Sequence, residues 1–158
     1  MKIIVLGDTH GILSKAEKAL KRENDCELIL HTGDFFADAQ RLSNRCGIPF
    51  LGVIGNCDRY DFRLKEPRES LFELAGKRLL LLHGHEQKVK TGLLSLLLKG
   101  KEQEADIVIF GHTHRAEAIM EEGILLLNPG SISLPRDGAP SYALLKLGEE
   151  LNWEIKRL

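Results

Sequence analysis

The sequence has few cysteines, and those present show no pairing pattern. Its 158 residues include only Cys26, Cys46 and Cys57, an odd set without Cys-x-x-Cys spacing. This scarcity argues against a disulfide framework and against a thiolate zinc site, and it suits a reducing compartment. We therefore expect three reduced thiols and a cytoplasmic location.

Neither sign of charge is in excess. The chain carries 22 lysines and arginines against 23 aspartates and glutamates, a formal net charge of -1. A protein without a positive excess has no overall field to hold nucleic acid or an anionic membrane. We therefore expect neither bulk nucleic-acid binding nor membrane binding, and any recognition of phosphate must be local.

Long apolar runs are also missing. The run at 3–6 ends at Gly7 and is too short for a signal-peptide core or a membrane span, and the run at 93–98 is interrupted by Ser95. No internal repeat, low-complexity tract or linker divides the chain. With 43% apolar residues, residues 1–158 are expected to form a single domain.

The first half of the chain alternates apolar runs with amphipathic stretches. The runs predict strands at 3–6, 27–31 and 48–54, and the stretches predict helices at 14–24 and 37–45. Ser14 is expected to be the N-cap of the first helix. This alternation favours a parallel βαβ arrangement, whose ligands gather at the carboxyl ends of the strands.

From Ser70 onward the pattern changes to hairpins. The segments 71–74 and 78–82 predict a hairpin with Gly76 in its turn. Two further hairpins are predicted, one from 116–121 and 124–127 and the other from 142–147 and 151–155. A helix is predicted at 89–98, a strand at 106–110 and a turn-forming loop at 128–131. One layer cannot readily hold all these strands. The predicted fold is α/β, with two stacked mixed β-sheets flanked by helices in a four-layer α/β/β/α sandwich.

All six histidines lie where an apolar strand run stops. They are His10, His31, His83, His85, His112 and His114. Together with Asp8, Asp34 and Asn56 they supply oxygen and nitrogen ligands from five strand ends. This set is too large for one ion, so it predicts two divalent cations about 3.5–4 Å apart that share a carboxylate. Each Gly-Asp or Gly-Asn pair alone is more simply read as a turn with a helix cap.

In their order along the chain, these motifs resemble the calcineurin-like metallophosphoesterases, particularly the small prokaryotic phosphodiesterase branch. The motifs are Asp8-x-His10, Gly33-Asp34, Gly55-Asn56, His83 and Gly111-His112-x-His114, and Asn128-Pro129-Gly130-Ser131 matches a loop common in that branch. The resemblance implies that one metal is bound by Asp8, His10, Asp34 and His114. It implies that the other is bound by Asp34, Asn56, His83 and His112, with Asp34 bridging.

The resemblance also implies a reaction. A hydroxide held by both ions would attack a small phosphodiester substrate, and no covalent enzyme intermediate would form. Two carboxylates against two divalent ions leave about +2 of charge, which a hydroxide and a phosphodiester anion neutralise. Nitrogen ligands mixed with carboxylates favour a transition ion over Mg²⁺, with Mn²⁺ expected first and Ni²⁺, Fe²⁺ or Zn²⁺ as alternatives.

Several residues beside the ligands are further candidates. Asn56, Asp58 and His85 are expected to contribute to catalysis, His85 by supporting a ligand or by contacting phosphate. His31 is expected to make a structural hydrogen bond. Arg115 is expected to be exposed at the start of a strand, and contact with substrate is left open.

Cys57 departs from a pattern in this superfamily. The larger phosphomonoesterases usually carry a histidine after the Gly-Asn pair, and a thiol is a poor general acid. The small phosphodiesterase branch shares this gap, so Cys57 supports that branch while making reactions with poor leaving groups doubtful.

Other functions remain open to the same residues. The fold also resembles the retromer scaffold subunit of eukaryotes, which recruits partners without evident need for catalysis, so a non-catalytic protein-binding scaffold is one alternative. A phosphomonoesterase or a nuclease of the superfamily is another, although the nucleases carry extensions for which no length is left. All seven ligand positions are filled, which favours an enzyme. The segments 59–68 and 135–140 are expected to set specificity, and a homo-oligomer stays open.

Overall fold

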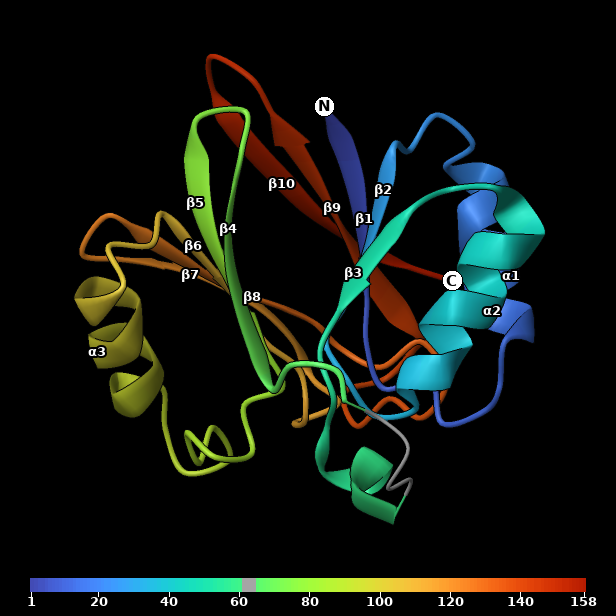
Figure 1. Ribbon diagram of the computed structural model, residues 1–158, viewed down its shortest axis with the longest axis horizontal. Helices are drawn as coiled ribbons and strands as arrows, with labels where there is room; N and C mark the ends of the chain where they lie inside the picture. Colours follow the sequence, from blue (N-terminus) through green and yellow to red (C-terminus); the bar gives the residue numbers. More distant parts are fainter. Residues whose placement is uncertain (61–64) are drawn as a thin grey trace.

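The computed structural model describes residues 1–60 and 65–158 of the chain. Two five-stranded sheets, built from these residues, pack face to face with helices outside them (Figure 1). The elements of the first half are β1 (Lys2–Leu6), α1 (Ser14–Arg22), β2 (Leu28–His31), α2 (Phe36–Cys46), β3 (Phe50–Gly52) and the 3-10 turn η1 (Asn56–Tyr60). Those of the second half are β4 (Glu69–Leu74), β5 (Lys77–Leu82), α3 (Leu94–Glu102), β6 (Ile107–Ile109), β7 (Ala116–Glu121), β8 (Ile124–Pro129), β9 (Ser141–Leu147) and β10 (Leu151–Arg157).

The first sheet joins the two ends of the chain. Its strand order is β10-β9-β1-β2-β3. Strands β1, β2 and β3 are parallel, with Leu6 opposite His31 in the register, and β9 and β10 are antiparallel to their neighbours. The predicted parallel arrangement of the first three strands and the predicted C-terminal hairpin are both confirmed.

The second sheet comes from the middle of the chain. Its order is β4-β5-β6-β8-β7, with β5, β6 and β8 parallel and the two edge strands antiparallel. The predicted hairpin turn is confirmed at Ala75 and Gly76, which both have positive φ, as tight hairpin turns of this kind require. Because β1, β2, β3, β5 and β6 run the same way, their carboxyl ends lie at one edge of the sandwich, the lower edge in Figure 1.

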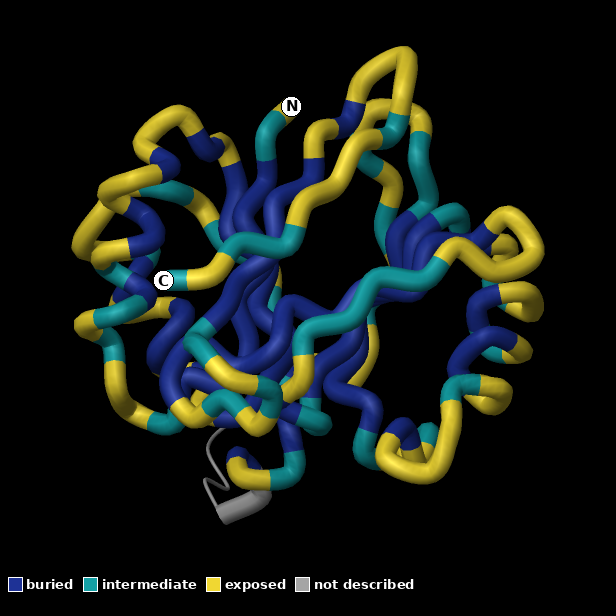
Figure 2. The backbone as a smooth tube through the Cα atoms, turned by 180° about the vertical axis from the view of Figure 1, so that it is seen from behind, coloured by how far each residue is buried: buried dark blue, intermediate teal, exposed yellow. Residues whose placement is uncertain are grey.

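Alternating side chains of the strands fill three apolar layers. In β1, Ile3 and Val5 face the other sheet, while Ile4 and Leu6 face the helices. Successive side chains of a strand point to opposite faces, so strands buried on both faces are apolar throughout. Figure 2 shows these strands as the buried centre of the molecule and places the exposed backbone on hairpin tips and outer helix faces.

The helices cover the outer face of each sheet. Helices α1 and α2 lie against the first sheet and α3 lies against the second (Figure 1). The predicted four-layer α/β/β/α sandwich is confirmed. Within residues 1–60 and 65–158, no helix is both long and apolar enough to cross a membrane.

The prediction for 89–98 is wrong at both ends. Helix α3 begins at Leu94 and ends at Glu102. The segment before it forms turns instead, with positive φ at Lys88 and Gly92. At the other end the helix continues through Gly100 because it packs closely on β6: a Cβ there would lie 2.7 Å from a methyl group of Val108.

Three smaller predictions are also corrected. Ser14 is not the N-cap of α1: that position is Leu13, and no side chain caps the helix. The third strand spans only Phe50–Gly52, because the chain leaves the sheet early towards η1. Residues 128–131 are not wholly a loop, since β8 continues through Pro129 in pairing with β7.

Candidate metal centre

Five strand ends deliver the predicted ligands to one edge. Asp8 and His10 follow β1, Asp34 follows β2, and Asn56 follows β3. From the second sheet, His83 follows β5, and His112 and His114 follow β6. The topology therefore brings together side chains from both sheets.

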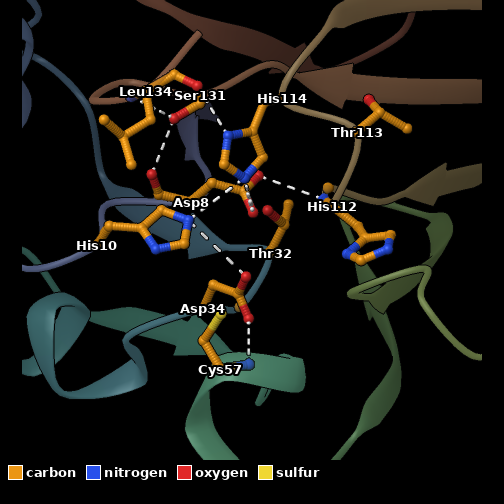
Figure 3. A network of polar contacts seen from close by, with 12 residues as sticks. Asp8, His10, Thr32, Asp34, Cys57, His112, Thr113, His114, Ser131 and Leu134 are labelled. Atoms are coloured by element: carbon orange, nitrogen blue, oxygen red, sulfur yellow. Dashed lines mark hydrogen bonds and ion pairs between the residues drawn. The ribbon is translucent and has the colours of Figure 1, made fainter. Parts of the chain in front are cut away.

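One group of four donors is tightly packed. Asp8, His10, Asp34 and His114 each place a ligand atom within 4.8 Å of the others. Figure 3 shows these four side chains directed toward one another, with Thr113 directed away. The Nε2 atoms of His10 and His114 lie 3.3 Å apart.

The tautomer of His114 is fixed by a neighbouring carbonyl. Its Nδ1 donates to the backbone oxygen of Leu134 at 2.7 Å. In the neutral ring, Nε2 then carries a lone pair, and this lone pair faces His10 and also Oδ1 of Asp8 at 3.4 Å. A backbone partner on one nitrogen with the other aimed at acceptors is the usual arrangement of a metal-binding histidine.

A second group lies on the other side of Asp34. The Nδ1 atom of His83 donates to the backbone oxygen of Thr32 at 2.8 Å, which leaves its Nε2 to face Oδ1 of Asn56 at 3.1 Å and Oδ1 of Asp34 at 3.4 Å. The ring of His112 lies with its centre 5.0 Å from that of His83. The four residues predicted for a second ion thus lie around His83, but in the described part of the chain only the first group brings all its His and Asp ligand atoms within 4.8 Å of one another.

Asp34 stands between the two groups. Its Oδ2 lies 3.8 Å from Nε2 of His10, and its Oδ1 faces His83. The side chain is 3% exposed. Burial pushes the pKa of Asp34 upward, but the His83 ring and the backbone amide of Cys57 outweigh burial and hold that pKa well below its usual range. The carboxylate therefore stays ionised, with one oxygen for each group.

The donor set fits divalent cations. Oδ1 of Asp8 is buried and has no hydrogen-bond partner in the described part of the chain. Imidazole nitrogens and carboxylate oxygens that converge without protons between them repel one another unless a cation lies among them. Mixed nitrogen and oxygen donors suit divalent transition ions.

The backbone around the site is unusual. Asp8, His10, Asp34, His112 and His114 all have positive φ, from 48° to 69°. Non-glycine residues adopt this region rarely and at a cost, and such residues cluster at functional sites. Five of the seven predicted ligands share this feature, which supports a functional rather than a structural role for the cluster.

Two glycines allow the ligands to approach one another. A Cβ on Gly55 would lie 2.1 Å from Oδ1 of Asp34, and a Cβ on Gly33 would lie 2.9 Å from Nδ1 of His83. Gly33 also has a φ of +102°. Glycine stands before Asp34 and before Asn56 because the backbone passes against a neighbouring ligand at both points.

A family model described as the calcineurin-like phosphoesterase superfamily domain matches residues 1–150. The chain belongs to this superfamily. A probable metallophosphoesterase of Methanothermobacter thermautotrophicus is 38% identical over 162 residues, which cover 99% of this chain and 92% of that protein. Phosphodiesterase YfcE of Escherichia coli is 28% identical over 174 residues, which cover 92% of this chain and 87% of that protein. These relatives support the small prokaryotic branch.

The fold is also found in a solved structure of low sequence identity. The structure of Vps29 from Entamoeba histolytica complexed with zinc has a TM-score of 0.81 at 20% sequence identity, and it covers 100% of this chain and 98% of that chain. At this identity the similarity shows the fold alone.

The pKa values of the site histidines are shifted in different directions. The neighbouring Asp8 carboxylate raises the pKa of His114. Burial lowers the pKa of His83, but Asp34, Asp8 and the Thr32 carbonyl outweigh it and raise that pKa. Burial, aided by His83 and Lys90, lowers the pKa of His112 to about 4. His112 is thus held neutral at physiological pH, as a ligand must be.

Two predicted residues make supporting contacts. His31 is fully buried, its Nδ1 accepts from the amide of Gly33 at 3.2 Å, and burial lowers its pKa, which agrees with the expected structural role. Asp58 accepts from the amides of Phe36 at 2.9 Å and Gly55 at 2.8 Å. Both oxygens of Asp58 are thereby used to join α2 to the loop after β3, so its contacts are those of a positioning residue.

His85 and Cys57 lie at the edge of the second group. The ring centres of His85 and His83 are 5.3 Å apart, and those of His85 and His112 are 6.0 Å apart. The amide of Cys57 donates to Oδ1 of Asp34 at 2.8 Å. Burial and the Asp34 carboxylate raise the pKa of the Cys57 thiol to about 11, so the thiol stays protonated.

The segment 128–131, at the end of β8, supports the ligands in a way that sequence reasoning missed. The Ser131 hydroxyl donates to the backbone oxygen of Asp8 at 2.9 Å, and the Asn128 amide donates to the backbone oxygen of Gly111 at 3.1 Å. The loop therefore ties the chain after β1 to the chain after β6. The Asn-Pro-Gly-Ser motif was the available signal, but the motif does not reveal which backbone oxygens it binds.

Proposed function

We propose that this protein is a metal-dependent phosphodiesterase that hydrolyses small phosphodiesters with two divalent transition ions, Mn²⁺ first and Ni²⁺, Fe²⁺ or Zn²⁺ as alternatives. The observation that carries the proposal is the placement of Asp34, whose two oxygens face two separate groups of donors. The phosphodiesterase relative of Escherichia coli supports the reaction class.

The proposal assigns ligands to each ion. Asp8, His10, Asp34 and His114 would hold one ion, and Asp34, Asn56, His83 and His112 would hold the other. Bound there, two divalent ions would supply a hydroxide nucleophile at neutral pH and positive charge for the phosphoryl oxygens. The neutral amide of Asn56 adds no negative charge, so the surplus positive charge remains available to an anionic diester.

The side chains around the ligands would restrict the reaction. The Leu134 and Thr32 carbonyls hold His114 and His83 in the tautomers that ligation needs. His85 lies close enough to both His83 and His112 to contact a bound phosphate or support a ligand. Cys57, with its raised pKa, would give little proton to a leaving group. Diesters with acidic leaving groups should therefore react best.

Further parts of the proposal concern the whole chain. We take residues 1–158 as one metallophosphoesterase domain, because the first sheet uses strands from both ends of the chain. A cytoplasmic location is consistent with three free cysteines in the described structure.

A non-catalytic scaffold is the second candidate, because the chain shares its fold with Vps29. That Vps29 structure is a zinc complex, so metal binding alone does not separate the two functions. Catalytic turnover distinguishes an enzyme from a scaffold. The choice of substrate distinguishes a phosphodiesterase from a phosphomonoesterase or a nuclease.

The test is a substrate screen with metal-analysed protein. Bis(p-nitrophenyl) phosphate, cyclic nucleotides and dinucleotides should be hydrolysed faster than p-nitrophenyl phosphate, a monoester. Asp34→Asn is the control for contaminating phosphatases. Metal-loaded protein that hydrolyses no diester, or that acts only on monoesters or long DNA, contradicts the proposal.

A further inference from the structure

A basic cavity lies beside the metal centre. Its volume is about 560 Å³, and its lining includes Lys90, Thr113, Arg115 and Arg136. These residues come from the turns before α3, from the loop after β6 and from the segment after β8, so the fold rather than one motif assembles the cavity.

The cavity adjoins the predicted ligands directly. Thr113 stands between His112 and His114 in the chain, and the backbone amide of Arg136 donates to the backbone oxygen of His114 at 2.9 Å. Lys90 lines the same cavity as Thr113, the residue between these two histidines. A molecule held at the metal centre could therefore extend into the cavity.

The three cations of the cavity are not used by the fold. Within residues 1–60 and 65–158, Lys90, Arg115 and Arg136 make no ion pair, whereas other cations, such as Lys2 and Arg78, pair with carboxylates. All three are exposed. They are available to a ligand without breaking an existing contact.

The acids of the cavity do not cancel this charge. Asp137 forms an ion pair with Arg157, in which Nη2 of Arg157 lies 2.8 Å from Oδ2 of Asp137. Asp137 also accepts a hydrogen bond from the backbone amide of Ala116 at 2.7 Å. Glu117 remains as the one other acid among the lining residues. The summed charge of the side chains that line the cavity is therefore positive, although the net charge of the whole chain is -1.

We propose that this cavity binds a second phosphate group of the substrate, so that the preferred substrates are diesters that carry an additional phosphate. The proposal rests on the proposed phosphodiesterase function and names its substrate class. Guanidinium groups suit phosphate because their planar donors can bind two oxygens at once. Arg115 and Arg136 would set specificity without touching the reacting phosphorus.

The test compares two substrates with the same leaving group. One is the p-nitrophenyl ester of thymidine 5′-phosphate, and the other is the same ester with a 3′-phosphate. Metal-loaded wild-type protein should show a kcat/KM at least about fivefold higher for the phosphorylated ester, the scale expected from a few partly exposed charge contacts. This preference should fall as salt is raised.

Two variants and a matched control locate the effect. Arg136→Gln and Arg115→Gln should lose the preference while keeping the rate on the simpler ester. Arg22→Gln is the control, because Arg22 is exposed at the end of α1, away from the cavity. A parallel calorimetric measurement should show thymidine 3′,5′-bisphosphate binding metal-loaded protein more tightly than thymidine 5′-phosphate, and again only with both arginines present.

The outcomes separate the two proposals. Diester hydrolysis with equal kcat/KM for both esters and equal binding of both nucleotides would overturn the cavity proposal and leave the phosphodiesterase standing. No hydrolysis, with bisphosphate binding that depends on Arg136, would overturn the phosphodiesterase and keep the cavity as a phosphate site. A preference that survives in both variants would also overturn the cavity proposal.

Discussion

The Nε2 atoms of His10 and His114 face each other across 3.3 Å, although 104 positions separate them in the sequence. The other nitrogen of His114 already donates to Leu134. Two ring nitrogens this close, with the Asp8 carboxylate beside them, form a donor set that suits a cation. The fold thus brings side chains from the ends of β1 and β6 together.

Asp34→Asn should remove the negative charge of the carboxylate that lies between the two groups of donors. We expect activity to fall by more than about 100-fold, beyond the usual cost of losing a residue that merely supports a ligand. Asp38→Asn is the matched control: Asp38 is also buried, and it accepts from the amide of Gly11 at 2.8 Å. Metal content and diester hydrolysis should be measured for both. Similar, mild losses in the two variants would refute the bridging role.

Gly55→Ala should displace Asp34 without removing any ligand. The new methyl group would lie 2.1 Å from Oδ1 of Asp34, and a shift of about 1 Å at a reacting centre can cost about 100-fold in rate. Gly148→Ala serves as control, because no atom lies near its added Cβ. The rate of diester hydrolysis and the midpoint of thermal unfolding should be measured for both variants. A Gly55→Ala protein with wild-type activity would show that the close contact has no consequence.

Cys57→His should help poor leaving groups selectively. A placed proton donor is typically worth about 10²–10⁴-fold, and only part of this can appear because nothing here holds the new ring in a productive orientation. Alkyl diesters should gain, while activated aryl diesters should change little. Cys46→His, at another exposed cysteine, is the control. If the dependence of rate on leaving-group acidity is the same in wild type and Cys57→His, residue 57 does not lie where a proton donor would act.

Glu23 should make the fold sensitive to acid. Burial raises its pKa, but hydrogen bonds from Lys2, Lys156 and Tyr142 outweigh burial and lower it to about 2, from 4.5. The unfolded chain therefore binds the proton first as pH falls, so this stabilisation is present above about pH 4.5 and is lost as pH falls towards 2. Its size is on the order of 2 kcal/mol.

Urea unfolding of wild type and Glu23→Gln checks this expectation. With chelator present throughout, the variant should be less stable at about pH 7, and the difference should shrink by about pH 3. Glu121→Gln, at an exposed position at the end of β7, should behave as wild type at both values. A difference that does not change with pH would contradict the role of the Glu23 charge.

The sequence was most informative where strands end. Short apolar runs followed by Gly and a ligand residue located the strand ends that bear Asp8, Asp34 and His112, because the length of a buried run and its stop are local features. The order of the strands in each sheet was not predictable, since pairing depends on contacts between distant segments. The start of α3 was missed because Val89 is buried in a turn rather than in a helix.

The surroundings of the site were less predictable than the ligands. The Leu134 carbonyl that orients His114 is a backbone group, and its residue type gives no signal. The basic cavity was also hidden, because Lys90 and Arg136 are distant in sequence, and their lack of ion pairs with other described residues is a property of the fold. Part of the specificity segment predicted at 59–68 lies outside the described residues, at 61–64.

The most direct measurement is hydrolysis of bis(p-nitrophenyl) phosphate by metal-free protein as Mn²⁺ is added back, with bound metal determined at each step. Nitrogen-rich sites favour Mn²⁺ over Mg²⁺, so Mg²⁺ at equal concentration should activate less. The rate should be negligible in the chelated protein and should rise to a plateau at about two ions per chain, because the donors around Asp34 form two groups. Unchanged turnover in protein shown to be metal-free, or a plateau at one ion, would contradict the two-metal centre.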